Sequence, residues 1–115
     1  IDTYAFYHCS SISAITIPST VTSVQREAFA HCEAATTITV NGNAAVLKVY
    51  SFYYCSGATT ITINSNVATI EDNAFQDCQA ATTITINNSV VTIGKNAKVR
   101  AKTTVPQDVK GGEQV

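Results

Sequence analysis

The segment AFAHCEAATTITV at residues 28–40 recurs, with small changes, as SFYYCSGATTITI at residues 51–63 and AFQDCQAATTITI at residues 74–86. A related version, AFYHCSSISAITI, occupies residues 5–17. The cysteines of these segments are evenly spaced, because 32−9, 55−32 and 78−55 all equal 23. A repeat period of about 20–50 residues is typical of solenoids, in which each repeat stacks on its neighbours. The sequence therefore predicts a repeat solenoid.

Two further positions keep the same register. The residue three before each cysteine is phenylalanine, and the residue six after it is isoleucine: Phe6, Phe29, Phe52 and Phe75, and Ile15, Ile38, Ile61 and Ile84. Segments 14–17, 37–40, 60–63 and 83–86 alternate apolar side chains with mainly threonine, which is the period-2 pattern of a half-buried β-strand. We expect isoleucine to face the core and threonine to face solvent.

Each predicted strand is followed by turn-forming residues, such as Asn41-Gly42 and Asn64-Ser65. A second, shorter strand is predicted beyond the turn, as at 21–24 and 67–70. The Ala-Phe-x-x-Cys piece is too short for a full helix, which favours a tight helical turn or an irregular arc. The predicted architecture has a parallel sheet on one face of the solenoid and short strands and turns on the other.

The four cysteines share the register of the apolar ladders. Equivalent residues on neighbouring repeats lie about 5 Å apart, which is within the Cα range of a disulfide. Side chains at one register point the same way, however, and parallel Cβ vectors do not easily give the disulfide dihedral. A ladder of buried free thiols is the favoured interpretation, and disulfides between neighbouring repeats remain the alternative. Zinc is disfavoured because no C-x-x-C pair is present.

Composition sets limits on partners. The chain has 115 residues, of which 45% are hydrophobic and 13% charged, and its formal net charge is −1. Such a balance provides no global field toward nucleic acid or an anionic membrane, and no apolar run reaches the length of a membrane span. The first residue, Ile1, aligns with Val24 in mid-repeat, so we expect the sequence to be a mature or excised fragment.

The run I-x-x-I-x-I-P-x-x-V-x-x-V from Ile12 to Val24, together with Ala28-Phe29-x-x-Cys32, resembles the BspA-like (treponemal-type) leucine-rich repeat. The resemblance covers about residues 1–97 and implies a β-rich leucine-rich-repeat solenoid with a curved parallel sheet. It also implies an extracellular or cell-surface protein, often an adhesin, with no catalytic residues to carry over. The sequence departs from the family pattern in having alanine for leucine at 35, 58 and 81, and asparagine for proline at 41, 64 and 87.

The repeat decays near the C-terminus. We expect a leucine-rich-repeat solenoid of about four repeats over 1–97, and a degenerate cap with a polar tail over 98–115. Lys98 stands where phenylalanine should be, and Ala101 where cysteine should be. Thr103-Thr104-Val105 then restores the strand motif two residues early, because 103−82 is 21. Lysines and Pro106 would protect the open end of a sheet.

Two sets of residues are candidates for a binding face. The predicted strands carry an ordered hydroxyl array, and a group of tyrosines precedes the third cysteine. The candidates are Thr37, Thr39, Thr60, Thr62, Thr83 and Thr85, and Tyr50, Tyr53 and Tyr54. Threonine also suits any exposed strand, and tyrosine can be partly buried between arcs. Thr-x-Thr ladders resemble the ice-binding faces of some antifreeze β-solenoids, whereas exposed tyrosines favour interfaces.

No constellation points to catalysis. His8 and His31 lie one repeat apart and could share a metal, but two ligands without a third are weak evidence, and we predict no metal and no cofactor. The His-Cys pairs lack a third group to orient a base, so we predict no enzyme. The leading hypothesis is a non-catalytic surface or secreted binding module, or adhesin, that recognises a protein or glycan, with no nucleic acid partner and no membrane insertion. The alternatives are a self-assembling protein that associates end to end and an ice-binding protein.

Overall fold

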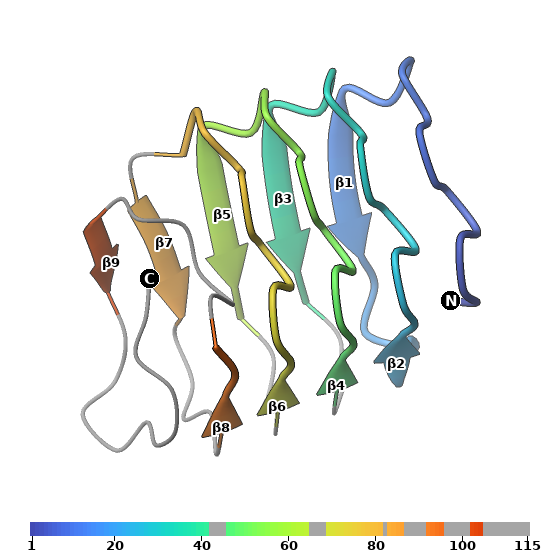
Figure 1. Cartoon of the computed structure of the whole chain (residues 1–115), viewed down its shortest axis with the longest axis vertical. Coiled ribbons are helices and arrows are strands. Elements are labelled where there is room, and N and C mark those ends of the chain that lie inside the picture. Colours follow the sequence, from blue (N-terminus) through green and yellow to red (C-terminus); the bar gives the residue numbers. More distant parts are fainter. Residues whose placement is uncertain (42–45, 65–68, 82, 87–91, 96–101, 105–115) are drawn as a thin grey trace.

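In a computed structural model the chain forms a coil bounded by two parallel sheets (Figure 1). The structure describes residues 1–41, 46–64, 69–81, 83–86, 92–95 and 102–104. The main sheet has the order β1-β3-β5-β7-β9, with bounds Ala14–Ile17, Thr37–Val40, Thr60–Ile63, Thr83–Ile86 and Lys102–Thr104. The short-strand sheet has the order β2-β4-β6-β8, with bounds Ser23–Val24, Val46–Leu47, Thr69–Ile70 and Thr92–Ile93. The predicted parallel-sheet solenoid is confirmed.

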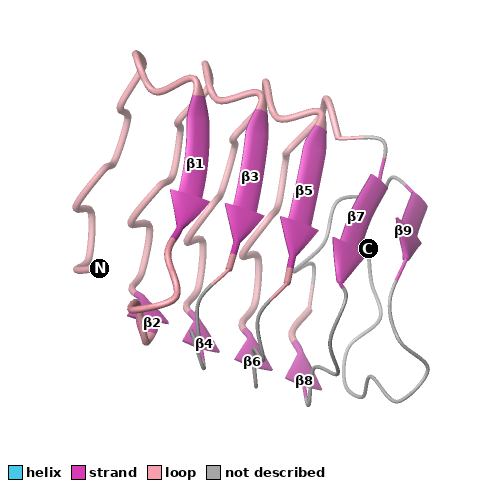
Figure 2. Ribbon diagram, turned by 180° about the vertical axis from the view of Figure 1, so that it is seen from behind, coloured by secondary structure: helices cyan, strands magenta, loops and turns pink. Residues whose placement is uncertain are grey.

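One coil of the solenoid, here called a rung, runs from an arc through a main strand to a short strand. The four rungs are residues 4–26, 27–49, 50–72 and 73–95. Figure 2 shows the chain returning from the short strands β2 and β4 to the next main strands as loops, and within the described ranges no residue is helical. The expected tight, irregular arc is therefore correct, and it consists of successive turns.

Pairing between main strands follows the sequence register: Ile15 lies opposite Ile38, Ile38 opposite Ile61, and Ile61 opposite Ile84. The last strand breaks this interval, because Thr103 of β9 lies opposite Ile84, and 103−84 is only 19. The predicted alignment of Thr103 with Thr82 is therefore wrong by two residues. A shift of two residues keeps every side chain on the same face of a sheet, so the alternation of residue types alone could not detect it. Strand β9 lies inside the segment expected to form a cap.

The interior consists of ladders of like residues. Phe29, Phe52 and Phe75 are at most 5% exposed, and neighbouring rings stack at centroid distances of 5.0–5.3 Å with interplanar angles of 2–7°. Phe6 completes the stack but is 40% exposed, because only its Phe29 side is covered by another ring among the described residues. The predicted phenylalanine and isoleucine ladders are confirmed.

The cysteines form a third ladder of free thiols. Cys32, Cys55 and Cys78 are buried, and Cys9 in the first rung is half-buried. Each buried thiol donates to the carbonyl oxygen of the phenylalanine 26 residues earlier, at Sγ–O distances of 3.2–3.3 Å. The interpretation as core thiols, rather than disulfides, is confirmed. Burial raises the pKa of Cys32 to about 11. The pKa of Cys55 is also raised, mainly by a hydrogen bond with Cys78 and secondly by burial.

These thiols give a first prediction. At pH 8 an aromatic disulfide reagent should label Cys9 in the native protein and leave the three buried thiols unreacted until the protein unfolds.

A thiol whose pKa is raised on folding stabilises the native state below the unfolded pKa of about 8.5, and this contribution is lost as pH rises through the folded pKa. The free energy of unfolding should therefore fall between about pH 8.5 and 11. Rapid native labelling of all four thiols would contradict the assignment, and Cys9→Ser should remove the fast phase.

A second prediction concerns Ser51, which is fully buried at a register that carries alanine in the other three rungs. Its Oγ is the one buried side-chain oxygen or nitrogen without a hydrogen-bond partner among the described residues. Leaving a buried hydroxyl unsatisfied costs about 1–3 kcal/mol. Ser51→Ala should therefore stabilise the protein by about 1 kcal/mol, measured as a higher denaturant midpoint at unchanged slope. The reverse change in the preceding rung, Ala28→Ser, should destabilise by a similar amount; a stabilising Ala28→Ser would refute this explanation.

Candidate functional site

The threonines predicted to form a binding face lie in two columns on the main sheet. Thr37, Thr60 and Thr83 are paired in register, and so are Thr39, Thr62 and Thr85. We call these six residues the threonine columns. Thr37 and Thr60 are exposed, whereas Thr39, Thr62 and Thr85 are half-buried. The isoleucines between them face the core, so the described side chains of the columns, those of Thr37, Thr39, Thr60, Thr62 and Thr85, project from the outer face of the sheet as predicted from the period-2 pattern.

The predicted tyrosines belong to a larger group of touching rings on the arcs. Seven rings in three rungs form an aromatic cluster, defined as Tyr4, Tyr7, His8, His31, Tyr50, Tyr53 and Tyr54. His31 lies at its centre, with ring-centroid distances of 5.5 Å to Tyr7 and 5.3 Å to Tyr53. Tyr4 is 51% exposed and Tyr7 42%, while the three tyrosines of the third rung are half-buried. The cluster is therefore a packed but solvent-accessible surface.

The cluster and the threonine columns face different directions. The phenylalanines of the arcs and the isoleucines of the main strands are buried in one core cluster, so arc and strand lie on opposite sides of that core. Side chains that project outward from an arc therefore point away from those that project outward from the main sheet. The two predicted sets of residues therefore lie on two separate surfaces, the main sheet and the arcs.

Backbone geometry fixes how the aromatic side chains project. Each arc has two residues in the left-handed region, four positions apart, with φ between 52° and 62°. They are Tyr4, His8, Glu27, His31, Tyr50, Tyr54, Asn73 and Asp77. A non-glycine residue costs about 1–2 kcal/mol in this conformation, with asparagine and aspartate tolerated best. Five of these eight positions nevertheless carry rings, and the ring-bearing positions end where the fourth rung has Asn73 and Asp77.

Charged groups surround the cluster. The Arg26 guanidinium lies over the Tyr50 ring, with Cζ 6.0 Å from the centroid, and its Nε donates to Glu27 Oε2 at 3.1 Å. The same carboxylate accepts a hydrogen bond from Tyr4 Oη at 3.3 Å, and hydrogen bonds with Tyr4 and then Glu27 raise the pKa of Arg26. These contacts join the end of the first rung to the start of the second and third.

Two more carboxylates lie beside the central rings. Glu33 Oε2 is 3.7 Å from His31 Nδ1. Burial, and then the charge of Asp77, raises the pKa of Tyr53. Because Asp77 occupies the register of Tyr54 one rung later, it forms the acidic edge of the cluster on the side of the fourth rung.

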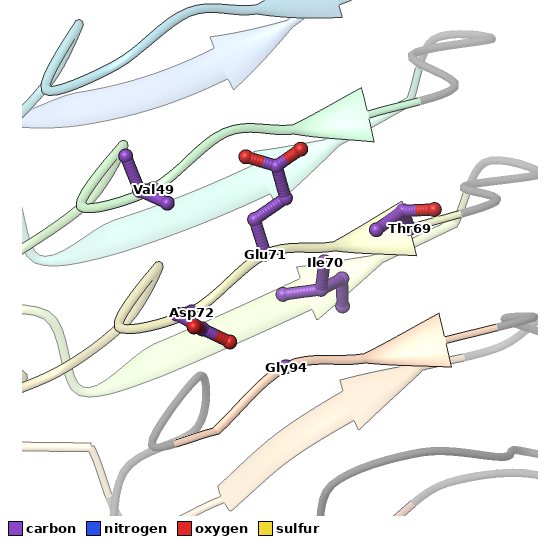
Figure 3. A pocket seen from close by; sticks show the side chains of 6 residues that line it. All are labelled: Val49, Thr69, Ile70, Glu71, Asp72 and Gly94. Atoms are coloured by element: carbon purple, nitrogen blue, oxygen red, sulfur yellow. The ribbon is translucent and has the colours of Figure 1, made fainter.

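A hollow opens between the third and fourth rungs, lined by Val49, Thr69, Ile70, Glu71, Asp72 and Gly94 (Figure 3). Gly94 occupies the register where the two preceding rungs have Glu71 and Lys48, whose side chains form an ion pair at 3.7 Å. A Cβ at Gly94 would come within 2.6 Å of Asp72 N, so the close approach of the two rungs beside the hollow requires glycine there. Asp72 Oδ1 accepts a hydrogen bond from the backbone N–H of Lys95 at 2.8 Å, so this carboxylate holds two rungs together. We assign the hollow a structural origin.

Among the described residues, no third side chain lies close enough to His8 and His31 to complete a metal site. His8 and His31 stack with ring centroids 6.0 Å apart. Across the described ranges, no group of three or more His, Cys, Asp or Glu side chains could hold a metal ion. Nor does the described part of the chain contain a helix long and apolar enough to cross a membrane.

Stacked rungs of equal length, a parallel main sheet and interior ladders of Phe, Cys and Ile define a leucine-rich-repeat solenoid. A family model described as BspA type leucine rich repeat region (6 copies) matches residues 1–103. The chain therefore belongs to the BspA type leucine-rich-repeat family, and the match extends past the expected limit of the repeats at residue 97. Members of this family are typically surface-associated or secreted, and the repeat is generally a non-enzymatic binding module. No curated protein and no solved structure matches the chain.

Sequence reasoning found Tyr50, Tyr53 and Tyr54 but missed the roles of Tyr4, Arg26 and Glu27. The available signal was the register, since Tyr4 and Tyr50 both stand five residues before a cysteine. The left-handed positions carried only a weak signal: none of the eight is a glycine, but His8, His31, Asn73 and Asp77 are residue types enriched in that region.

The left-handed geometry gives a third prediction. Tyr54→Gly and Tyr54→Ala remove the same ring, but only glycine relieves the strain at φ 59°. The glycine variant should therefore be more stable than the alanine variant by about 1 kcal/mol, as measured by chemical unfolding. At Tyr53, whose φ is not positive, the alanine variant should instead be more stable than the glycine variant. An alanine variant more stable than glycine at residue 54 would show that the left-handed conformation is not maintained.

Proposed function

We propose that this protein is a non-catalytic binding module, displayed at a cell surface or secreted, that recognises a protein or glycan partner through the aromatic cluster. The observation that carries this proposal is the continuity of seven rings across three rungs. Tyrosine buries a large area at low conformational-entropy cost and is enriched at binding hot spots. Mutual packing of these rings further reduces the freedom that would be lost on binding.

Backbone strain supports the same surface. Glycine or asparagine at the left-handed positions would remove a cost of about 1–2 kcal/mol per residue. The first three rungs instead have aromatic residues at Tyr4, His8, His31, Tyr50 and Tyr54. Rings kept at strained positions and left accessible to solvent are better explained by recognition than by stability. The family, whose members are typically surface proteins involved in binding, agrees with this interpretation.

The threonine columns are the weaker candidate for the same role. Threonine suits any exposed strand position, and its small side chain offers little area to a partner. The adjoining hydroxyls are already engaged within the fold, since Thr36 Oγ1 donates to Ser13 O and Thr59 Oγ1 to Thr36 O. The in-register arrangement of the threonine columns is the one observation that supports ice binding.

End-to-end self-association is the second candidate function. Phe6 exposes 40% of its surface at the open side of the first rung, and its other side stacks on Phe29. A further ring of the same register could cover it, in the way that Phe29 is covered by Phe52. Sedimentation of the protein at increasing concentration distinguishes this function from the first, which requires no self-association.

A fourth prediction tests the proposed function. The protein is screened against a glycan microarray and a random dodecapeptide display library. Ligands that bind should lose about tenfold or more in affinity for the variant Tyr7→Ser/Tyr53→Ser, because hot-spot rings each contribute about 1–2 kcal/mol or more. The matched control, Thr39→Ser/Thr62→Ser, alters two half-buried residues on the main sheet and should keep the affinity. Selected ligands that bind the tyrosine variant unchanged but lose affinity for the threonine variant would place recognition on the main sheet instead.

A further inference from the structure

We propose that the partner presents a basic segment, and that the aromatic cluster binds arginine side chains of that segment between its tyrosine faces and the neighbouring carboxylates. This inference rests on the proposed function and specifies the chemistry of its partner. It assigns the central role to Tyr7, Tyr53 and Tyr54, with Glu33 and Asp77 as the anionic groups.

The protein already binds one guanidinium of its own in this way. Arg26 lies over Tyr50 at 6.0 Å, and Glu27 accepts from its Nε at 3.1 Å. A cation over a ring face, with a carboxylate in hydrogen-bond distance, combines cation–π attraction with a charge-assisted hydrogen bond. The geometry of the arcs therefore suits guanidinium groups, and the internal example shows which pair of side chains provides the contact.

The rings around His31 and Tyr53 also have carboxylates beside them, but the described residues place no arginine or lysine over these rings. Glu33, with 46% of its side chain exposed, lies beside His31, and burial followed by the charge of Asp77 raises the pKa of Tyr53. In the described part of the chain, neither carboxylate forms an ion pair with a lysine or arginine. The register of Arg26 carries Val49 in the next rung, so the sequence supplies no second arginine there. Among the described residues, these rings and carboxylates therefore outnumber the lysine and arginine side chains that contact them.

The distribution of charge supports a cationic partner. The arcs, taken as the equivalent residues 3–10, 26–33, 49–56 and 72–79, contain four acidic residues and one arginine, which gives a formal charge of 1−4 = −3 with histidine neutral. The acidic residues are Glu27, Glu33, Asp72 and Asp77. The whole chain carries only −1, so the arcs hold an excess of negative charge that the rest of the sequence balances. A local negative field raises the on-rate and specificity for positively charged segments and disfavours anionic ones.

The test uses an eight-residue peptide of alternating arginine and serine, and the same peptide with citrulline in place of arginine. Citrulline keeps the shape and most of the hydrogen-bonding groups but removes the charge. We expect saturable binding of the arginine peptide by titration calorimetry, at least tenfold tighter than that of the citrulline peptide. Tyr53→Leu should weaken binding about threefold to tenfold through the lost cation–π contact, whereas Tyr53→Phe should retain it.

The carboxylates are tested by variants that change charge and little else. Glu33→Gln and Asp77→Asn should each weaken binding about threefold at low salt, and asparagine tolerates the left-handed backbone at residue 77. Glu71→Gln is the matched control, since it removes a carboxylate that faces Lys48 outside the cluster. Thermal unfolding of each variant establishes that it is folded.

Three outcomes would overturn the inference: absence of arginine-peptide binding, equal binding of the citrulline peptide, or equal weakening by Glu71→Gln. Its failure is distinguishable from failure of the proposed function. If a neutral oligosaccharide from the array binds and loses affinity with Tyr53→Leu, the aromatic cluster remains the binding site and the partner is a glycan. If no ligand of any kind depends on Tyr7 or Tyr53, both proposals are wrong.

Discussion

The core of the first four rungs depends on parallel pairing at one fixed sequence interval, which places each core side chain against its equivalent in the next rung. The interior is therefore a set of ladders, some made of one residue type, such as the phenylalanines, and others of similar apolar types, such as Val24, Leu47 and Ile70. Phenylalanine rings stack at 5.0–5.3 Å because the rung spacing matches the separation of offset aromatic pairs. Thiols can follow a similar rule, since each finds a carbonyl oxygen at an equivalent place. A local exception such as Ser51 stands out because its neighbours in the ladder are alanines.

The same constraint determined how much could be predicted. Strand positions and inward faces followed from the alternation of Ile and Thr, and the core role of the cysteines followed from the register they share with Phe29 and Ile38. The offset of β9 did not, because a two-residue shift preserves the faces on which the prediction relied. The left-handed arcs did not either, since the residue types at Tyr4, Glu27 and Tyr50 give no sign of positive φ.

For the candidate site, the repeat register assigned Thr60 to the sheet and Tyr53 to the arc, but it did not give the contacts between side chains. The ring contacts through which His31 joins Tyr7 to Tyr53 are seen only in the structure. Likewise, the contact of Arg26 with Tyr50 joins residues 24 apart, one position more than the repeat, so a search by equivalent positions does not find it.

Solenoid geometry also explains why function should reside in irregular positions. Ladder positions are restricted because a change in one rung must fit the same site in two neighbours, whereas outward arc positions contact solvent and can vary from rung to rung. The column of His8, His31, Tyr54 and Asp77 has one backbone conformation but three side-chain chemistries. A repeated backbone thus presents a non-repeated row of side chains, aromatic over three rungs and acidic at the fourth. Such a row has a direction, so an extended basic segment would be distinguished by the order of its side chains as well as by its charge.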